Sequence, residues 1–309
     1  MSSRRFRNLN RMAIAVFAFF LAMEAPAQVA RVFLSGTGDD LNDCSNAATP
    51  CRSLQAAVNQ SSVNGQVIVM TSGGFGTANI TKSLTINAPA GIVAFDARTI
   101  NVTIGATDKV VIRGLSMNGA VFGDSVGINF NSGGTLVVED SVIAGFLIGI
   151  QQNVTGSNLV VKNCEFRKNG TGISATTFTG PQPALTIEHC RFASNMYQGV
   201  FLYDVHAVVR DSVAFGNGIG FRLQGSVIGT SMLLDGCIIS HNTTGISSEG
   251  YTAQVPTVVR VTNSTIFGNT YGVSTFQTGE IVSYGTNHLW RSQYQPFDGG
   301  TFTSTVSRQ

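Results

Sequence analysis

The chain has 309 residues, of which 35 are glycine and only 12% are charged, and its formal net charge is +2. Exposed helices are rich in charged residues, so this composition favours strands and turns over a helical protein. Five cysteines is an odd number, which leaves at least one free thiol if the chain is exported.

The first 27 residues have the three parts of a secretory signal peptide. A basic leader, MSSRRFRNLNR, precedes the apolar run AIAVFAFFLAM, and Ala25, Pro26 and Ala27 form an A-x-A cleavage signal. A membrane anchor is the alternative, but the run is short for a span and Glu24 follows it. We therefore predict that residues 1–27 are removed and that the protein is secreted, to the periplasm, the cell surface or the extracellular space.

Removal of this leader changes the charge of the protein. It contains four of the 19 basic residues and one of the 17 acidic residues, so the mature chain has 15 basic and 16 acidic residues and a net charge of −1. No basic run remains that could follow a phosphate backbone, which argues against nucleic acid as a partner. No second apolar run is long enough to span a membrane.

Residues 28–65 are predicted to form an N-terminal loop and a capping helix. The helix is expected within CRSLQAAVNQ (51–60), where Leu54, Ala57 and Val58 share one face. Cys44 and Cys51 are predicted to form a disulfide that closes a short loop in an oxidising compartment.

Three acids lie just ahead of this loop. Asp39, Asp40 and Asp43 could bind Ca²⁺, although a solvated, turn-forming acidic loop explains them as well and is favoured. No other cofactor is predicted, because the four histidines are scattered and no metal-binding motif is present.

Residues 66–285 contain a repeat of 17 to 27 residues. The last apolar residue of each predicted strand marks it: Val69, Ile86, Ile112, Val138, Val161, Ile187, Val209, Leu234 and Val261. Short β-branched runs at this period indicate a solenoid of parallel strands, with one repeat per coil. Residues 286–309, which include the only tryptophan, Trp290, break the repeat and are predicted to form a C-terminal cap.

Equivalent residues of successive coils should lie side by side, so each column of the repeat should be physically consistent. The residues after the marker alternate in charge: Arg113, Glu139, Lys162, Glu188, Arg210 and Asp235. We interpret them as an exposed ladder of ion pairs rather than a catalytic charge cluster.

Two further columns predict the turn between strands. Cys164, Cys190 and Cys237 fall in a column of small residues and are expected to be buried free thiols, although Cys164 and Cys190 lie within disulfide reach. An asparagine recurs a few residues later, where we expect a left-handed turn: Asn169, Asn195, Asn217, Asn242 and Asn269.

A third strand of each coil should begin at a recurring glycine followed by an apolar residue. Polar and aromatic residues on this strand are candidates for ligand binding: Asn129, Gln151, Phe201, Tyr203 and Arg222, with Tyr197, Tyr251 and Tyr271 on flanking loops. Flat aromatic rings beside amides suit sugar rings. The alternative is that these aromatic residues are merely scattered over the surface.

These columns resemble the right-handed parallel β-helix proteins, an architecture shared by pectate lyases, pectin lyases and polygalacturonases. The string SGTGDDLNDCSNAATPCRSLQAAVNQ is similar to the N-terminal segment and capping helix of that superfamily. The whole mature chain also resembles a group of secreted bacterial β-helix repeat proteins without established activity. The resemblance implies an all-β fold, a single-stranded right-handed parallel β-helix with a short N-terminal capping helix.

The catalytic motifs of those enzymes are missing. The segment LTIEHC resembles a pectate lyase strand, but His189 falls in a turn column that also holds Asp140, Asn163 and Asp211. The Asn-Thr-Asp, Asp-Asp and Gly-His-Gly patterns of polygalacturonases are absent from the predicted coils. Fold alone does not specify chemistry, so no catalytic residue is assigned.

We therefore predict a secreted, non-catalytic β-helix protein that binds polysaccharide or acts as a structural or adhesive module at a cell surface. The alternative is a polysaccharide lyase or glycoside hydrolase acting on an acidic polysaccharide. Its first candidate catalytic residues are Arg210, Asp211 and Arg222.

Overall fold

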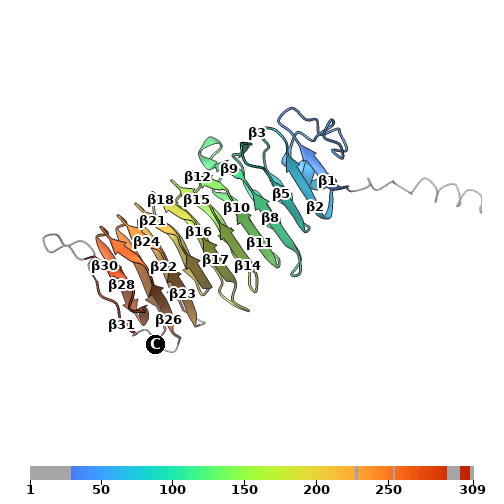
Figure 1. Cartoon of the computed structure of the whole chain (residues 1–309). Helices are drawn as coiled ribbons and strands as arrows, with labels where there is room; N and C mark the ends of the chain where they lie inside the picture. The colour runs from blue at the N-terminus through green and yellow to red at the C-terminus, as the bar shows by residue number, and fades with distance from the viewer. Residues whose placement is uncertain (1–28, 227–228, 253–254, 291–299, 307–309) are drawn as a thin grey trace, which may run out of the picture.

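The computed structural model of the chain describes residues 29–226, 229–252, 255–290 and 300–306. Over these residues the chain winds into an elongated stack of coils, with three sheets running along its length (Figure 1). Each complete coil contributes one strand to each sheet, and the strand pairs between neighbouring coils are parallel. The predicted fold class, an all-β parallel solenoid, is confirmed, and the predicted signal peptide lies outside the described residues.

The three sheets are named here A, B and C, in the order in which each coil visits them. Sheet A has 12 described strands: β1 (Val29–Leu34), β2 (Ser61–Val69), β5 (Leu84–Asn87), β8 (Lys109–Arg113), β11 (Thr135–Glu139), β14 (Asn158–Lys162), β17 (Ala184–Glu188), β20 (His206–Arg210), β23 (Thr230–Asp235), β26 (Thr257–Thr262), β29 (Gly279–Ser283) and β31 (Ser304–Thr305). Sheet B has ten: β3 (Gly73–Gly74), β6 (Ala94–Asp96), β9 (Leu115–Asn118), β12 (Val142–Ala144), β15 (Glu165–Arg167), β18 (Arg191–Ala193), β21 (Val213–Phe215), β24 (Ile238–Ser240), β27 (Thr265–Phe267) and β30 (His288–Leu289). Sheet C has nine: β4 (Ala78–Ile80), β7 (Ile100–Thr103), β10 (Val126–Ser132), β13 (Ile148–Gln152), β16 (Thr171–Thr176), β19 (Gln198–Tyr203), β22 (Ile219–Gly225), β25 (Thr244–Gly250) and β28 (Tyr271–Gln277).

The interior is filled by apolar columns that run from coil to coil. The marker residues of sheet A from Ile86 onward are paired in register and fully buried, as the repeat predicts. One marker is wrong, because Val67 rather than Val69 lies opposite Ile86. In sheet B the rings of Phe166 and Phe192 stack with their centroids 5.1 Å apart. Burial of each such side chain contributes about 1.5–3 kcal/mol to stability.

The recurring glycine near the start of the sheet C strands from β10 to β25 is required by close packing between coils. A Cβ atom added to Gly172 would lie 2.5 Å from the carbonyl oxygen of Gly199 and 2.9 Å from the ring of Phe192. Any larger residue would therefore push the coils apart.

The asparagine column differs from its prediction. The left-handed residue of this turn is the preceding one in each coil, with φ of 53° at Lys168 and 55° at Ser194. The asparagines themselves are buried and form a ladder: in each step the side-chain oxygen accepts from the backbone N–H of the asparagine one coil earlier. This arrangement satisfies backbone groups that the sharp turn would otherwise bury without partners.

One inward column contains an unexpected carboxyl group. Asp96 pairs in register with Met117 and is 2% exposed, so it occupies a position that later coils fill with apolar residues. Its Oδ1 accepts from the backbone N–H of Arg98 at 2.9 Å, and its Oδ2 has no hydrogen-bond partner among the described residues. Burial raises the pKa of Asp96 to about 7.

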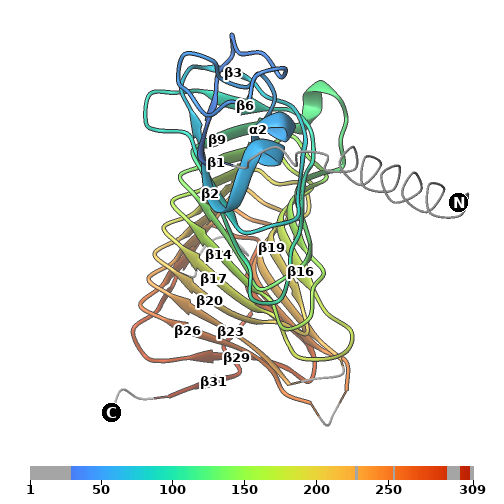
Figure 2. The ribbon, with the colours of Figure 1, turned by 90° about the vertical axis from the view of Figure 1, so that its right-hand side faces the viewer.

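The N-terminal end of the stack is covered by helix α2 (Leu54–Gln60), as predicted (Figure 2). Its buried residues are Leu54, Ala57 and Val58, and the Oγ of Ser53 caps it by accepting from the N–H of Ala56. The predicted N-terminal loop also contains a strand, β1, which pairs with β2 in sheet A.

At the other end, the predicted cap partly continues the sheets. Strands β30 and β31 extend sheets B and A, and Phe302 packs against the core. Trp290 is 70% exposed, so it does not close the core.

Candidate functional site

The five predicted ligand-binding residues all lie on the outer face of sheet C. The structure aligns four of them, with one equivalent residue from each other coil, in a column that crosses the sheet. In coil order the column is Asn79, Asn101, Asn129, Gln151, Ser174, Phe201, Arg222, Ser247 and Ser274. Tyr203 lies two residues further along its strand, in a parallel outward column with Thr176, Gln224, Glu249 and Phe276.

The N-terminal half of this face carries a ladder of amides. The Nδ2 of Asn101 donates to the Oδ1 of Asn79 at 3.0 Å, and the Nδ2 of Asn129 donates to the Oδ1 of Asn101 at 3.3 Å. Each amide here therefore has a neighbouring amide as its partner.

The C-terminal half carries a charged network instead. The guanidinium of Arg222 donates from Nε and Nη2 to the two carboxylate oxygens of Glu249, both at 2.8 Å. Gln224, Ser247 and Tyr251 also donate to this carboxylate, at 2.6, 2.8 and 2.9 Å. A carboxylate with this many donors is rigidly oriented.

This network fixes the charge state of Glu249. Partial burial opposes ionisation, but the hydrogen bonds from Arg222, Gln224, Ser247 and Tyr251 outweigh it and lower the pKa of Glu249 to about 2. At neutral pH the group is therefore a carboxylate, with no proton to donate.

Aromatic rings surround the network. Phe178 and Tyr203 lie 5.1 Å apart between ring centroids, Tyr251 and Phe276 lie 5.9 Å apart, and the guanidinium of Arg222 lies 5.6 Å from the ring of Phe201. Phe178, Phe276 and Tyr251 are 65%, 51% and 42% exposed. These rings follow the strands from β16 to β28, which at a strand spacing of about 4.8 Å cover roughly 19 Å.

The sequence analysis missed four members of this cluster: Phe178, Gln224, Glu249 and Phe276. The last three stand two residues beyond a position on the outer face, and side chains along a strand return to the same face every second residue. This two-residue period is the sequence signal that could have identified them. Phe178 lies on a loop, where the repeat has no period to follow.

The three candidate catalytic residues are not brought together. Arg210 ends β20 in sheet A, and its nearest carboxylate oxygen is that of Glu188 at 3.8 Å. Asp211 follows in a left-handed turn, with its Oδ2 3.8 Å from the Nε2 of His189. Arg222 lies on sheet C, in the network with Glu249.

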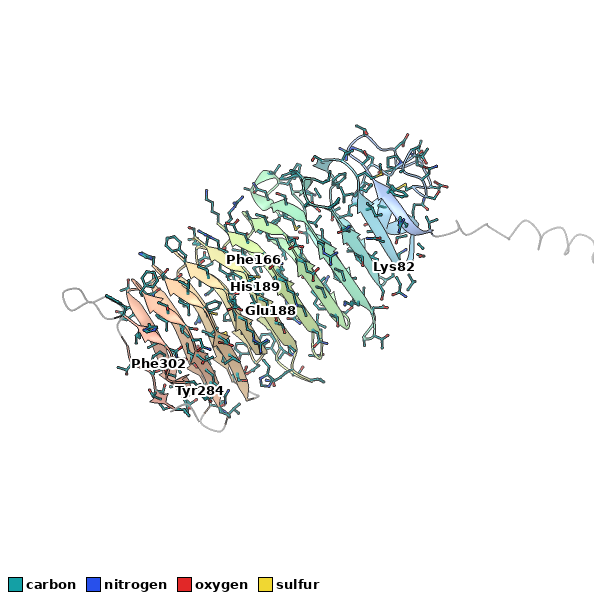
Figure 3. All side chains as sticks on the ribbon, in the orientation of Figure 1. Lys82, Phe166, Glu188, His189, Tyr284 and Phe302 are labelled. Carbon is teal, nitrogen blue, oxygen red and sulfur yellow. A yellow bond between two sulfur atoms is a disulfide. The ribbon has the colours of Figure 1, made fainter. Side chains whose placement is uncertain are left out.

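The alternating charges of sheet A lie in register as predicted, and three of the five neighbouring pairs form ion pairs: Arg113–Glu139, Lys162–Glu188 and Glu188–Arg210. Arg113 pairs with Glu139 at 2.9 Å through its Nε, and Lys162 pairs with Glu188 at 2.9 Å. The hydrogen bond from Lys162 lowers the pKa of Glu188, and the same bond raises the pKa of Lys162. Glu188 and His189 lie at the surface midway along the stack (Figure 3), and the φ of 53° at His189 confirms it as a turn residue.

The three cysteines in the small-residue column are free and buried, as predicted. Burial raises the pKa of the Cys237 thiol to about 12, so it is protonated at neutral pH. These thiols pack as small apolar residues.

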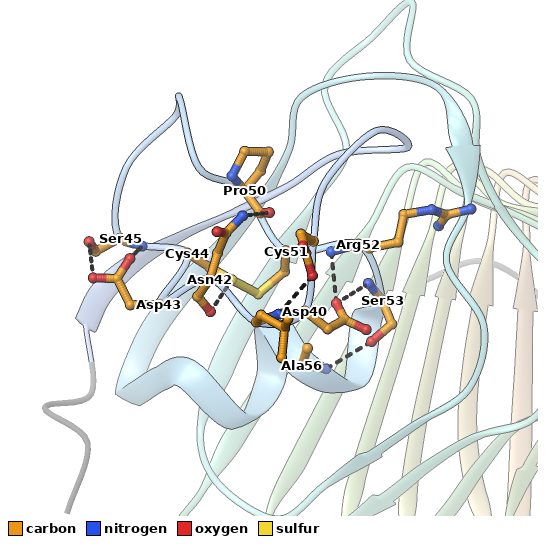
Figure 4. Close-up of a disulfide and its surroundings, with 12 residues drawn as sticks. Asp40, Asn42, Asp43, Cys44, Ser45, Pro50, Cys51, Arg52, Ser53 and Ala56 are labelled. Atoms are coloured by element: carbon orange, nitrogen blue, oxygen red, sulfur yellow. Dashed lines mark hydrogen bonds between the residues drawn. A yellow bond between two sulfur atoms is a disulfide. The ribbon is translucent and has the colours of Figure 1, made fainter. Parts of the chain in front are cut away.

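The N-terminal loop is closed by a disulfide between Cys44 and Cys51, with Cα atoms 5.2 Å apart (Figure 4). The nearby acids accept hydrogen bonds from backbone N–H groups in and beside the loop. The Oδ1 of Asp40 accepts from the N–H groups of Arg52 and Ser53 at 2.8 and 2.7 Å, and these bonds outweigh desolvation and lower its pKa. Asp39 and Asp43 accept from the N–H groups two residues further along. Within the described part of the chain, no group of three His, Cys, Asp or Glu residues is placed to hold a metal.

Among the described helices, none has the length and apolar character needed to cross a bilayer.

The model of the family "Right handed beta helix region" matches residues 104–207 and 184–287. No curated protein matches the chain by sequence. Among solved structures, the chain is similar to pectate lyase Pel9A, with a TM-score of 0.53 and 14% identity over 85% of this chain and 79% of that one. It is also similar to the GH136 lacto-N-biosidase from Eubacterium ramulus, with a TM-score of 0.49 and 11% identity over 90% of this chain and 67% of that one.

Proposed function

Because the chain belongs to the right-handed β-helix family, we propose that its function lies on the outer surface of the coils, where the C-terminal half of sheet C binds a polysaccharide without cleaving it. The surface meant is the aromatic face, defined as Phe178, Phe201, Tyr203, Arg222, Gln224, Glu249, Tyr251 and Phe276. The observation that carries the proposal is the row of exposed rings beside a fixed charged network.

Each part of the aromatic face suits a sugar ring. The exposed faces of Phe178, Tyr251 and Phe276 offer apolar area to the C–H side of a sugar. The partly exposed guanidinium of Arg222 has N–H donors beyond the two that bind Glu249, and these can offer directed hydrogen bonds to hydroxyl groups. Since the rings are spread over roughly 19 Å, they suit an extended chain of sugars better than a single one.

The chemistry of the face supports binding rather than hydrolysis. Glycosidases of the common type use two carboxyl groups about 5–10 Å apart, one of which must be able to donate a proton. Glu249 is the only carboxylate among the described outward residues of sheet C, and its pKa of about 2 leaves it without that proton.

The test combines retention with product analysis. Purified mature protein is passed over xylan, cellulose, polygalacturonate and alginate, with and without Ca²⁺, and new reducing or unsaturated chain ends are measured. We expect retention on at least one polymer with no new ends. A double variant, Tyr203→Ala with Phe276→Ala, should lose retention at least tenfold, whereas Asn101→Ala on the same sheet should retain wild-type binding. Equal retention of the double variant would refute the aromatic face as the site.

The alternative is a lyase or hydrolase acting on an acidic polysaccharide, and the structural similarity to a pectate lyase supports keeping it in the test. New chain ends from polygalacturonate or alginate that disappear in Arg210→Ala or Asp211→Ala would replace the proposed function with this one. Loss of chain-end release in Arg222→Ala alone would not distinguish a catalytic role from a binding role, because Arg222 belongs to the aromatic face.

We also propose that the protein works outside the cytoplasm. The predicted signal peptide (1–27) and the Cys44–Cys51 disulfide both suit an oxidising compartment. Mass spectrometry of the exported protein should give a chain that begins at Gln28 and carries one disulfide. A full-length chain in the cytoplasmic fraction would contradict this.

A further inference from the structure

A concave surface lies on sheet A, away from the aromatic face. It is a depression of about 220 Å³ on the outer side of strands β17, β20, β23 and β26. Its lining includes Thr186, His206, Val208, Ser231, Leu233 and Arg260. Neither the repeat nor the ion ladder explains why these side chains leave a hollow here.

Apart from Arg31 at the N-terminal end, Arg260 is the only charged residue in its column among the described strands. Its equivalents in the other coils, in order along sheet A, are Arg31, Gln66, Thr85, Val111, Val137, Val160, Thr186, Val208, Leu233, Val282 and Ser304. A guanidinium in a column of mostly aliphatic side chains is not needed for packing. Its presence indicates another role.

The charge of Arg260 has no ion-pair partner among the described residues. The residue is half-buried. By contrast, Arg113, Arg210 and Arg222 each face a glutamate at 4 Å or less. A partly desolvated guanidinium gains most from a planar anion that accepts two N–H bonds.

The rest of the depression defines the shape of the ligand. Thr186, Val208 and Leu233 form a largely apolar floor beside Arg260, and all three are half-buried. Two residues before Val208 and Leu233 on the same strands, His206 Nδ1 and Ser231 Oγ lie 3.1 Å apart and share a hydrogen bond. The hollow thus has a cationic side, an apolar floor and a polar side.

We propose that this depression binds a carboxylate group carried on a ligand with a non-polar face, with the carboxylate on Arg260 and the non-polar face on Val208 and Leu233. His206 and Ser231 then hydrogen-bond to polar groups on the far side of the ligand. This site is on a different sheet from the aromatic face, so its test is independent of the test of the proposed function.

The experiment compares two sugars that differ only in the group at C6. Glucuronate and glucose are titrated into ¹⁵N-labelled protein, and the Arg260 Nε–H resonance and the backbone amides of β20, β23 and β26 are followed by NMR. We expect glucuronate to shift these resonances and glucose to bind at least tenfold more weakly, since one charge-assisted pair of hydrogen bonds is worth that factor. Inorganic sulfate tests the apolar floor and should also bind at least tenfold more weakly than glucuronate.

Matched variants complete the test. Arg260→Gln should weaken glucuronate binding at least tenfold, and Arg260→Lys should fall between it and the wild type, because lysine keeps the charge and loses the bidentate geometry. Arg113→Gln, on the same sheet and outside the depression, should leave binding unchanged. Backbone amide spectra of each variant show that the solenoid is intact. Equal binding of glucose and glucuronate, or unchanged binding in Arg260→Gln, would overturn the carboxylate assignment, and equal binding of sulfate would overturn the role of the apolar floor.

Discussion

The two halves of the outer face of sheet C share one backbone arrangement and carry different side chains. In the N-terminal half, Asn79, Asn101 and Asn129 occupy equivalent positions and bond to one another. In the C-terminal half, the same column passes through Phe201 and Arg222, whose partner Glu249 has no acidic equivalent in the neighbouring coils. Stacked coils thus dictate where a side chain points, and repetition of one residue type is needed only where neighbours stabilise each other. We interpret the departure from repetition as the mark of a binding surface.

The largest effect is expected where repetition is buried. Asn217 accepts from the backbone N–H and side chain of Asn195, donates to the carbonyl of Phe192, and is 3% exposed. Asn217→Ala should lower the free energy of unfolding by about 4 kcal/mol, because two or more buried groups lose their partners at about 1–3 kcal/mol each. The control is Asn101→Ala in the exposed amide ladder, which should change it by no more than about 0.5 kcal/mol. Urea denaturation measures both, and equal losses would show that the two ladders do not differ as claimed.

A similar effect, with a pH dependence, is expected from Asp96. The folded-state pKa is about 7 against an ordinary value of 3.8, so the folded chain binds a proton that the unfolded chain has released between these pH values. This group therefore stabilises the fold fully below pH 3.8, and its contribution is lost as the pH rises to about 7, a change of about 4 kcal/mol. Asp96→Asn should remove this slope. An unchanged slope in the variant, by urea denaturation at pH 4.5 and 7.5, would contradict the assignment.

A smaller effect of opposite sign is expected in the aromatic face. The pKa of Glu249 is lowered from 4.5 to about 2, so its contribution is present above pH 4.5 and is lost as the pH falls through 2. Glu249→Gln should lower the free energy of unfolding at pH 7 by about 2–3 kcal/mol and abolish the difference from wild type near pH 2. Thermal unfolding at the two pH values measures this. A constant difference would mean that the carboxylate charge is not what stabilises the network.

The smallest effect is expected in the exposed ion ladder of sheet A. Glu188 pairs with Lys162 and Arg210, but all three side chains are at least 25% exposed. Glu188→Gln should therefore shift the thermal midpoint only slightly, and 1 M NaCl should remove the shift. A large decrease in the thermal midpoint that salt does not change would mean that the ion ladder stabilises the fold as much as the buried asparagine ladder does.

Much of the fold could be predicted because each interior column is constrained by the coil above and the coil below. Val161 and Ile187, for example, occupy a buried column whose β-branched residues can be recognised in the sequence. The turn asparagines were assigned the wrong backbone conformation because two neighbouring residues share the turn. In the structure one takes the positive φ, as Ser194 does, and the other, Asn195, provides the buried amide.

The site was only partly predictable. Phe201, Tyr203 and Arg222 were placed correctly on one face, but their partners Glu249 and Phe178 come from another coil and a loop. The depression around Arg260 was not found either, since a hollow depends on which side chains fail to fill space. No period in the sequence encodes that.

Hydroxyl-radical footprinting of the protein, alone and saturated with the polysaccharide that retains it, tests the central claim most directly. The account predicts that oxidation of Phe178, Tyr203, Tyr251 and Phe276 falls on binding, while oxidation of Phe122 and of Phe267, exposed elsewhere on the coils, does not change. Protection of Phe122 or Phe267 with none in the aromatic face would contradict it.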